Sequence, residues 1–487
     1  MAEAALAIAL PVAAALLAVP AGRRAPWLLW PVAPGSLVLA WLLAQGAPST
    51  SALGGWEAPL GIVLRVDGLA AIFVGLSAVI GSAAGVFAVR YLQAREETRK
   101  SFAFWPLFFS LWAAVNAVFL SRDLFNLYVG LELLTLSAVA MVALDGRTST
   151  LVAAARYLLF ALFGSVAFLI GTALLYGAYG VLDMVLLADR IRPEPASWVA
   201  AALMSVGLLA KMALFPFHAW LPPAHGGAPA PASALLSALV VKASFYIFLR
   251  LWFDVLPPLA TPGVMTVFGL LGATAVVYGA ALAIRQQRLK LIIAYSTVAQ
   301  LGYLFLIFPL AGIGGEPEPW AASAWSGGVF QALAHGLAKA AMFLAAGAMI
   351  LSASDDRLSH MAGVGQSAPV ASFAFALSAV SLMGLPPSGG FLAKYLVLTA
   401  SLASGQWYWG AVLIVGGLMS AIYLFRPLNP LMRKRSDDAP PLARVHWTLE
   451  AAPLALAISA ILLGVASMGP YQLIQIGNPV AMIGGPP

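Results

Sequence analysis

Five charged residues lie within otherwise apolar stretches of this sequence. One is an acid, Glu132, and four are bases, Lys211, Lys242, Lys339 and Lys394. A lysine or carboxylate at the centre of a membrane helix costs about 2.5–3.5 kcal/mol on insertion scales, and charges retained there usually belong to ion or proton paths. These residues are therefore the first candidate site, and the chemistry they indicate is proton transfer through a membrane.

A histidine extends this set. Gln331, His335 and Lys339 are spaced four residues apart, so they share one face of a helix. A polar stripe along an apolar helix indicates a hydrated track. Imidazole titrates near neutral pH, and removal from water lowers the pKa of a lysine, so both side-chain types can exchange protons under working conditions.

Two of the lysines lie beside helix-breaking residues. Lys211 is followed by a first break, in "LLAKMALFPFHAWLP", and Lys394 is preceded by a second, in "GLPPSGGFLAKYL". The expected helix breaks are at Pro216, Pro222, Pro386 and Pro387. A proline leaves one helical carbonyl without its donor, and in lipid such a backbone is tolerated only when it is buried in protein or lines a wet cavity.

His218 and His225 lie seven residues apart across the first break. Their position beside Lys211 makes them candidates for the path by which protons enter. The structural alternative is that each is a loop histidine held by a hydrogen bond. No group of residues has the spacing of a metal site, and we expect no metal and no cofactor in this chain.

The composition indicates an integral membrane protein. Hydrophobic residues make up 62% of the chain and charged residues only 9%, whereas about a quarter of a soluble protein is charged. The net charge of +7 is scattered over short loops, which argues against nucleic-acid binding. The absence of cysteine excludes disulfides, thiolate metal sites and cysteine-ligated iron–sulfur clusters within this chain.

Apolar windows long enough to cross a bilayer recur along the whole chain and predict an all-α, polytopic fold of about fourteen spans. Two stretches, 103–253 and 262–427, each hold five spans with the fourth one interrupted. This pattern predicts two inverted five-helix repeats, because an odd number of spans reverses the second copy. Residues 1–102 would form three preceding helices, and 448–487 a last helix and tail.

Basic residues favour alternate loops of this arrangement. The first apolar run has no basic residue before it, which is not the order of a cleaved signal peptide. If the N-terminus is outside, the cytoplasmic loops receive most of the arginines and lysines, as the positive-inside rule expects. Examples are Arg23, Arg24, Arg95, Arg288 and Lys290. We therefore expect a prokaryotic cytoplasmic (inner) membrane protein with both termini outside.

The motifs around these charges resemble those of a known family. "RDLFNLYVGLELL", "LLAKMALFPFHAWLPPAHGGAPAPASALLSALVVKASFY", "QALAHGLAKAAMFL" and "MGLPPSGGFLAKYL" are similar to the antiporter-like membrane subunits of three kinds of assembly. These are respiratory complex I, membrane-bound hydrogenases with formate hydrogenlyases, and Mrp-type multisubunit cation/proton antiporters. The resemblance implies fourteen membrane helices, with helices seven and twelve broken.

The resemblance also implies roles for individual residues. The glutamate of the family's helix five matches Glu132, and the lysines of helices seven and eight match Lys211 and Lys242. The remaining matches, in helices eleven and twelve, are His335, Lys339 and Lys394. By this resemblance the six residues carry protons across the membrane.

"DLFNLYVGLE" and the lysine at 394 are most similar to the D-type subunit of Mrp antiporters or to its close hydrogenase relatives. The resemblance then implies a proton-translocating subunit of a cation/proton antiporter, working in the lipid bilayer with other membrane subunits, including related antiporter-like ones. Protons are the expected ion, and sodium is a second candidate. The alternative is a proton-pumping subunit of a complex I-like NADH/quinone oxidoreductase or membrane-bound hydrogenase.

Two further hypotheses belong to other classes. A redox enzyme acting on quinone within this chain would need a haem, flavin or cluster site, for which the sequence offers no cysteine and a single deep histidine, His335. A scaffold that only holds partners together predicts neutral substitutions at all six residues. We expect no catalytic site of its own in this chain; whether it serves a translocating oxidoreductase is left open.

Overall fold

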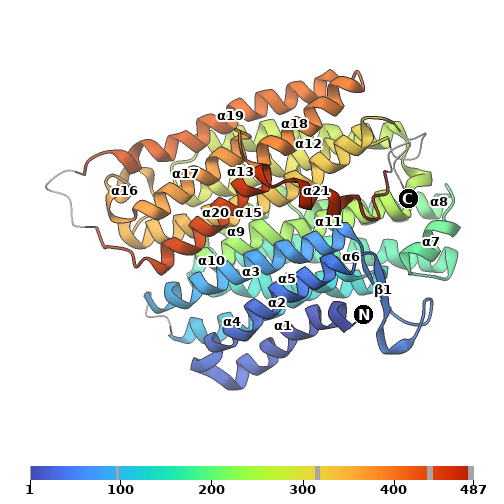
Figure 1. Cartoon of the computed structure of the whole chain (residues 1–487), viewed down its shortest axis with the longest axis horizontal. Helices are drawn as coiled ribbons and strands as arrows, with labels where there is room; N and C mark the ends of the chain where they lie inside the picture. Colours follow the sequence, from blue (N-terminus) through green and yellow to red (C-terminus); the bar gives the residue numbers. More distant parts are fainter. Residues whose placement is uncertain (1, 95–97, 313–317, 436–441, 481–487) are drawn as a thin grey trace.

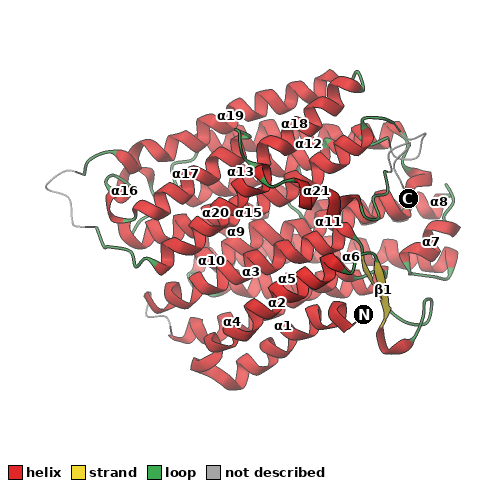
Figure 2. Cartoon of the chain, in the orientation of Figure 1, coloured by secondary structure: helices red, strands yellow, loops and turns green. Residues whose placement is uncertain are grey.

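The computed structural model describes residues 2–94, 98–312, 318–435 and 442–480. These residues form a bundle of long helices with one short β-hairpin (Figures 1 and 2). Arg95 and the last part of the predicted tail, 481–487, lie outside the described residues. In Figure 1, α1 and α2 lie at one edge of the bundle, and α18 and α19 at the opposite edge.

The N-terminal elements are α1 (Ala2–Ala21), η1 (Gly22–Leu28), α2 (Leu29–Gln45), β1 (Ser49–Ala52), η2 (Leu53–Gly55), β2 (Val63–Val66) and α3 (Gly68–Ala94). Next come α4 (Thr98–Leu120), α5 (Leu124–Ala143), α6 (Thr148–Tyr179), α7 (Met184–Arg190), α8 (Pro195–Lys211), η3 (Phe217–Trp220) and α9 (Leu221–Gly227). They are followed by α10 (Ala230–Leu235), η4 (Leu236–Val240), α11 (Val241–Arg250), η5 (Leu251–Val255) and η6 (Pro257–Leu259).

The second half contains α12 (Pro262–Arg285), α13 (Leu289–Phe305), α14 (Ile307–Leu310), α15 (Ala321–Ala353), η7 (Leu358–His360) and α16 (Val364–Ser367). It ends with α17 (Pro369–Met383), α18 (Gly389–Ala403), α19 (Trp407–Met432), α20 (Thr448–Val465) and α21 (Met468–Gln475). The hairpin pairs β1 with β2 in antiparallel fashion. Sequence patterning did not predict it.

Eleven helical stretches of the described residues are long and apolar enough to cross a membrane. The first of them, Ala2–Gln45, contains both α1 and α2. The two broken helices, α8 with α9 and α17 with α18, are divided into segments too short to be included. Counting α1 and α2 separately, and each broken helix once, gives the predicted fourteen spans. The predicted all-α, polytopic membrane fold is confirmed.

Two loops at one end of the bundle are joined by a backbone clip. The loop before α5 and the loop before α7 exchange hydrogen bonds, from Leu124 N to Leu182 O (3.0 Å) and from Met184 N to Arg122 O (2.8 Å). The guanidinium of Arg122 also lies 2.6 Å from the Asp183 carboxylate. The clip holds the starts of α5 and α7 side by side.

The second half repeats this clip. Leu289 N donates to Asp356 O (2.7 Å), and Leu358 N donates to Gln287 O (2.9 Å). The Arg288 guanidinium lies 2.9 Å from the same Asp356. In the first half, the loop before α5 is thus bonded to the loop after α6; in the second half, the loop before α13 is bonded to the loop after α15. We propose on this basis that the repeats divide at 103–253 and 262–427.

The first segment of the first broken helix, α8, ends at Lys211. Residues 212–216 are not helical, and Ala213 has a φ of 57°, in the left-handed region. Pro216 lies in this break, but Pro222 does not. Pro222 lies in the first turn of α9. Proline is tolerated there because the backbone N–H groups of a first turn have no helical acceptor, so its missing N–H breaks no helical hydrogen bond. The interruption is thus shorter and earlier than the prolines suggested.

The second broken helix divides between Met383 and Gly389. Gly384 closes α17 with a φ of 81°, a conformation that favours glycine. Ser388 begins α18, and its side chain accepts a hydrogen bond from Phe391 N. Pro386 and Pro387 lie between these caps.

Candidate functional site

Lys211 and Glu132 form a buried ion pair between α8 and α5. The Lys211 Nζ atom lies 3.6 Å from Glu132 Oε1 and donates to Thr135 Oγ1 at 2.7 Å and to Leu131 O at 3.5 Å. Ser165 of α6 donates a hydrogen bond to the Glu132 carboxylate. The Lys211 side chain is 4% exposed and that of Glu132 is 21% exposed. The ammonium is therefore held by oxygen atoms of one helix, α5.

Two glycines let this pair form. A Cβ atom on Gly164 would lie 2.6 Å from Gly207 O and 2.9 Å from the Lys211 Cγ atom. A Cβ atom on Gly207 would in turn lie 2.4 Å from Gly164 O. Real Cβ atoms do not approach so closely, so α6 and α8 pack backbone to backbone at this point. The Lys211 side chain lies against this close approach, beside Gly164.

Lys242 contacts His335 at the centre of the bundle. The Lys242 Nζ atom lies 2.5 Å from His335 Nδ1 and donates to Ser237 O at 2.7 Å. Lys242 is on α11, between the π-helical turns η4 and η5, whereas His335 is on α15. Both side chains are fully buried. Such π turns widen a helix and are frequent at functional sites.

Lys339 lies two turns along α15 from Gln331 and one turn from His335. Its Nζ atom donates to Ile293 O at 2.9 Å and to the Ser296 hydroxyl, both on α13. Lys339 is fully buried. The polar stripe predicted on this helix is therefore oriented toward α13 and α11, inside the protein.

Lys394 lies at the second break. Its Nζ atom donates to Leu382 O (2.9 Å) and Met383 O (3.0 Å), the last carbonyls of α17, and lies 4.7 Å from the centre of the Tyr303 ring. These carbonyls are free to accept because the helix is interrupted, so the N–H groups that would bond them in a continuous helix are missing. The proline break thus makes an ammonium site.

His225 and His218 occupy different surroundings. His225, on α9, is fully buried and stacks on Phe343 at 4.6 Å, and neither ring nitrogen has a hydrogen-bond partner among the described residues. His218, in the turn η3, is half-buried and its ring contacts Phe215 and Tyr278. His225 has the free ring nitrogens and burial that a proton carrier needs, and His218 lies among aromatic side chains.

A polar pocket of about 350 Å³ lies beside α9. It is formed by α6, α9, α13 and the loop between α12 and α13, and its wall includes Thr150, Gly226, Tyr295 and two arginines, Arg147 and Arg288. The pocket therefore adjoins the short helix that carries His225.

Sequence reasoning missed several polar partners. Thr135 and Ser165 bond the first ion pair, and Gln300 bonds Gln331 at 3.0 Å. Lys290 was expected in a loop, but it begins α13, is buried, and donates to Ala228 O at 2.6 Å. Uncharged polar residues on membrane helices give no hydropathy signal, and a lysine at a helix start is read as part of the loop.

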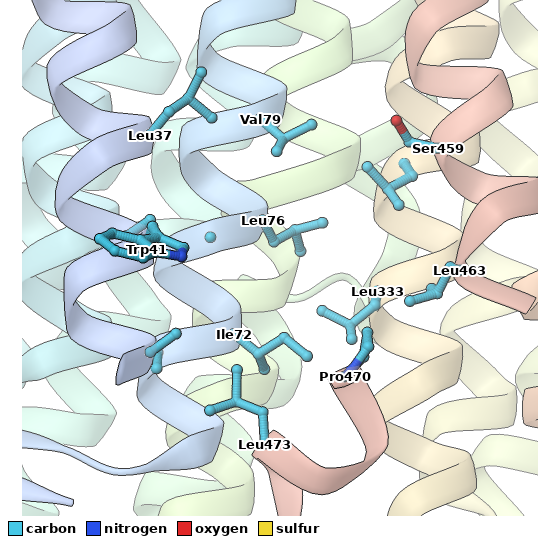
Figure 3. Close-up of a pocket in the computed structure, with 15 residues that line it drawn as sticks. Leu37, Trp41, Ile72, Leu76, Val79, Leu333, Ser459, Leu463, Pro470 and Leu473 are labelled. Carbon is cyan, nitrogen blue, oxygen red and sulfur yellow. The ribbon is translucent and has the colours of Figure 1, made fainter. Parts of the chain in front are cut away.

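The apolar pocket in Figure 3 is separate from these residues. It has a volume of about 350 Å³ and is lined by residues of α2, α3, α15, α20 and α21, among them Trp41, Leu76, Leu333 and Leu463. Ser459 is its polar lining residue, and no side chain that carries a charge lines it. The pocket is therefore unsuited to proton transfer. Among the described residues, no three His, Asp or Glu side chains gather as a metal site would require.

Residues 121–420 match the family described as NADH:quinone oxidoreductase/Mrp antiporter, transmembrane. The chain belongs to this family. The resemblance seen in its motifs is confirmed, and the protein is an antiporter-like integral membrane subunit of the kind found in Mrp and complex I-type assemblies.

Its relatives come from both kinds of assembly. The N-type subunit of the NADH-quinone oxidoreductase of Desulforudis audaxviator is 34% identical over 445 residues, 89% of this chain and 86% of the relative. The D-type subunit of the Na⁺/H⁺ antiporter of Alkalihalophilus pseudofirmus is 30% identical over 395 residues, 80% of this chain and 77% of the relative. Sequence identity supports the two groups about equally.

Solved structures share the fold. A chain of the Mrp complex of Dietzia sp. DQ12-45-1b has a TM-score of 0.88 at 24% identity, covering 98% of both chains. A chain of the membrane-bound sulfane sulfur reductase, an archaeal respiratory membrane complex, has a TM-score of 0.85 at 27% identity, covering 97% of this chain and 96% of that one. These neighbours are subunits of multisubunit membrane complexes.

Proposed function

We propose that this subunit moves protons across the membrane along Glu132, Lys211, Lys242, His335, Lys339 and Lys394. The observation that carries the proposal is the direct contact between Lys242 and His335, 2.5 Å apart, at the centre of the bundle. It joins α11, in the first proposed repeat, to α15, in the second. If this contact served only to hold the two helices together, a pair of apolar side chains would do so better than two basic groups that share a proton.

The first step is the opening and closing of the Glu132–Lys211 pair. While the carboxylate is near, the Lys211 ammonium is stabilised by an opposite charge in a medium of low dielectric constant. When the two separate, the ammonium keeps only the Thr135 hydroxyl and a carbonyl, and the neutral amine is favoured. Lys211 then gives its proton, through water, toward Lys242.

Protons enter from the polar pocket beside α9. His225 lies on α9, whose residues Gly226 and Gly227 line this pocket; it is fully buried and has both ring nitrogens without partners among the described residues. An imidazole accepts a proton at one nitrogen and gives it up from the other, so it suits this position. His218 would act only nearer the surface, since its ring is half-buried among aromatic side chains.

Protons leave through the second break. Lys394 is bound there by two carbonyls that the interruption of α17 exposes, together with the face of Tyr303. Neutral acceptors hold an ammonium less tightly than a carboxylate does. Lys394 can therefore release its proton without first breaking an ion pair.

The surroundings of this path follow from the function. We propose that the subunit lies in a prokaryotic cytoplasmic membrane with both termini outside, in contact with lipid and related antiporter-like subunits. Protons are the transported ion of this chain, and sodium is a second candidate. The driving reaction takes place in partner subunits, so the chain needs no catalytic site or cofactor of its own.

An Mrp-type cation/proton antiporter is the first candidate for the complex. The motif around Glu132 and the lysine at 394 favour it, as does the relative named as the D-type subunit of a Na⁺/H⁺ antiporter. The second candidate is a redox-driven proton pump. It is favoured by the 34% identity to a relative named as the N-type subunit of an NADH-quinone oxidoreductase.

The test is proton translocation by membrane vesicles from cells that lack the chromosomal copy of the gene and carry it on a plasmid. Translocation driven by a sodium gradient supports an antiporter, and translocation driven only by an electron donor supports the redox pump. With either driving force, proton translocation is expected only in vesicles from cells that carry the plasmid. Equal translocation with and without the subunit would contradict the function itself.

A further inference from the structure

A chain of amide groups connects the centre of the bundle to Lys394. Gln331 Nε2 donates to Gln300 Oε1 at 3.0 Å, and Gln300 Nε2 donates to Leu382 O at 3.0 Å. Leu382 O is the same carbonyl that accepts from Lys394 Nζ at 2.9 Å. The two donors thus share one oxygen atom at the end of α17.

The chain is buried and well packed. Gln300 is fully buried and Gln331 is 4% exposed. The Gln300 amide also approaches the Ser420 and Tyr423 hydroxyl groups of α19 at 3.4 and 3.5 Å. An uncharged polar group costs free energy when it is buried, so an apolar side chain would be the simpler choice if only packing were needed.

The chain has a direction. Each amide donates toward Leu382, so the oxygen ends point back toward the centre. At the central end, Gln331 Oε1 is buried and has no hydrogen-bond partner among the described residues. The same holds for His335 Nε2, one helical turn away on the same face of α15. Gln331 Oε1 and His335 Nε2 are thus both available for hydrogen bonding at the central end of the amide chain, where a proton would arrive.

We propose that Gln300 and Gln331 are positioning residues, which transmit the charge of His335 to the carbonyl that holds Lys394. The proposal rests on the proton path described above. When His335 is protonated, its N–H donates to Gln331 Oε1, directly or through water. Hydrogen bonds in series strengthen one another, so Gln300 then binds Leu382 O more tightly. The carbonyl holds Lys394 less tightly, and the arrival of one proton favours the departure of the next.

Several groups around Lys394 titrate or carry charge. Tyr303 of α13 faces it directly, Tyr423 of α19 lies behind Gln300, and His335 lies on α15. On its own helix the nearest titratable side chain is Tyr395. Lys394 and His335 are the two basic groups at the ends of the amide chain, so a change in the pH profile of transport would report on them.

The test compares Gln300→Leu, Gln331→Leu and the double variant in vesicles that hold the assembled complex. Each single variant is expected to slow translocation about fivefold, the effect of one net hydrogen bond, and the double variant no more than either alone. The pH of half-maximal rate should move upward in each, because Gln300→Leu leaves Leu382 O to Lys394 and Gln331→Leu weakens the competing hydrogen bond from Gln300. Ser378→Ala is the matched control, since Ser378 bonds only Ala374 O of its own helix.

Unchanged rates and pH profiles in both glutamine variants would overturn the proposal. So would losses that multiply in the double variant, or that accompany a matching loss of assembled complex with an unchanged pH profile, since these indicate independent structural roles. Lys211→Ala is run alongside. If it abolishes translocation while Gln300→Leu leaves both the rate and the pH profile unchanged, the proton path stands and the amide chain alone fails.

Discussion

The Lys242 Nζ atom lies 2.5 Å from the Nδ1 atom of His335, and both side chains are fully buried. At this distance one nitrogen donates and the other accepts, so the pair shares one proton. Lys242 also donates to Ser237 O, and both an ammonium and a neutral amine can do so. The shared proton can therefore rest on either nitrogen, and His335 Nε2 has no hydrogen-bond partner among the described residues.

Replacement of His335 by glutamine should slow proton translocation by about 100-fold, because the amide keeps a polar contact but cannot take up a proton. Lys242→Ala should have a similar effect, and the double variant should be no slower than either, since the two residues act as one unit. The rate of acidification of vesicle interiors measures this. Additive losses would mean that the residues serve separate paths.

Thr135→Val should reduce the translocation rate about fivefold, because it removes the 2.7 Å hydrogen bond to Lys211 without changing charge. Thr172→Val is the control. Thr172 is equally buried but bonds Phe168 O of its own helix, so its loss should leave the rate unchanged. Equal rates for both variants would show that Thr135 does not hold the ammonium.

Gly164→Ala should destabilise the subunit by about 1–3 kcal/mol, the usual effect of forcing an extra methyl into a packed interior. Its Cβ would meet both the Gly207 backbone and the Lys211 side chain. Gly177→Ala, on the same helix, has open space around the new Cβ and should not lower stability. Thermal unfolding of the detergent-solubilised complex compares them. Identical transitions would contradict the close approach of α6 and α8.

The Asp67 carboxylate, just before α3, gives the fold a pH dependence. Burial alone would raise the pKa of Asp67, but Arg250 and Arg65, at 2.5 and 2.7 Å, outweigh it and hold that pKa below its usual value. The resulting stabilisation is present above about pH 3.9, the pKa of an unfolded aspartate, and is lost as the pH falls through the lower folded-state value.

Arg250→Gln should therefore destabilise the protein by about 3–5 kcal/mol at neutral pH, because the buried carboxylate loses its closer cation and keeps Arg65 and the Ala70 N–H. Asp67→Asn in the same chain should restore part of the loss. Thermal unfolding at neutral pH compares the two variants with the unmodified protein. A destabilisation that the second substitution does not relieve would show that Arg250 acts through packing instead.

Charge made much of the architecture predictable from the sequence. Lysines and a glutamate in apolar runs are costly enough to mark the residues of the proposed path, and prolines marked the region of each break. The break itself was misplaced at Pro222, because a proline in the first turn of a helix and one in an interruption look alike in sequence. What decides between them is the backbone at Ala213, with its positive φ.

The contacts of the path were not predictable. The pairing of Lys242 with His335 joins residues 93 positions apart, and no local pattern gives their distance. In the sequence, nothing distinguishes Gln300 and Ser165 from other polar residues. Only the fold shows that Gln300 bonds Gln331 and that Ser165 bonds Glu132. Lys290 was misassigned because hydropathy does not distinguish a loop from the buried first turn of α13.

The most direct measurement is proton translocation by the Lys211→Ala variant in vesicles where the amount of assembled complex is shown to match the unmodified protein. Lys211 is the base of the ion pair with Glu132, and without it the proton has no carrier between the first break and Lys242. The proton path predicts that translocation is abolished while assembly is retained. Translocation at the unmodified rate would contradict it.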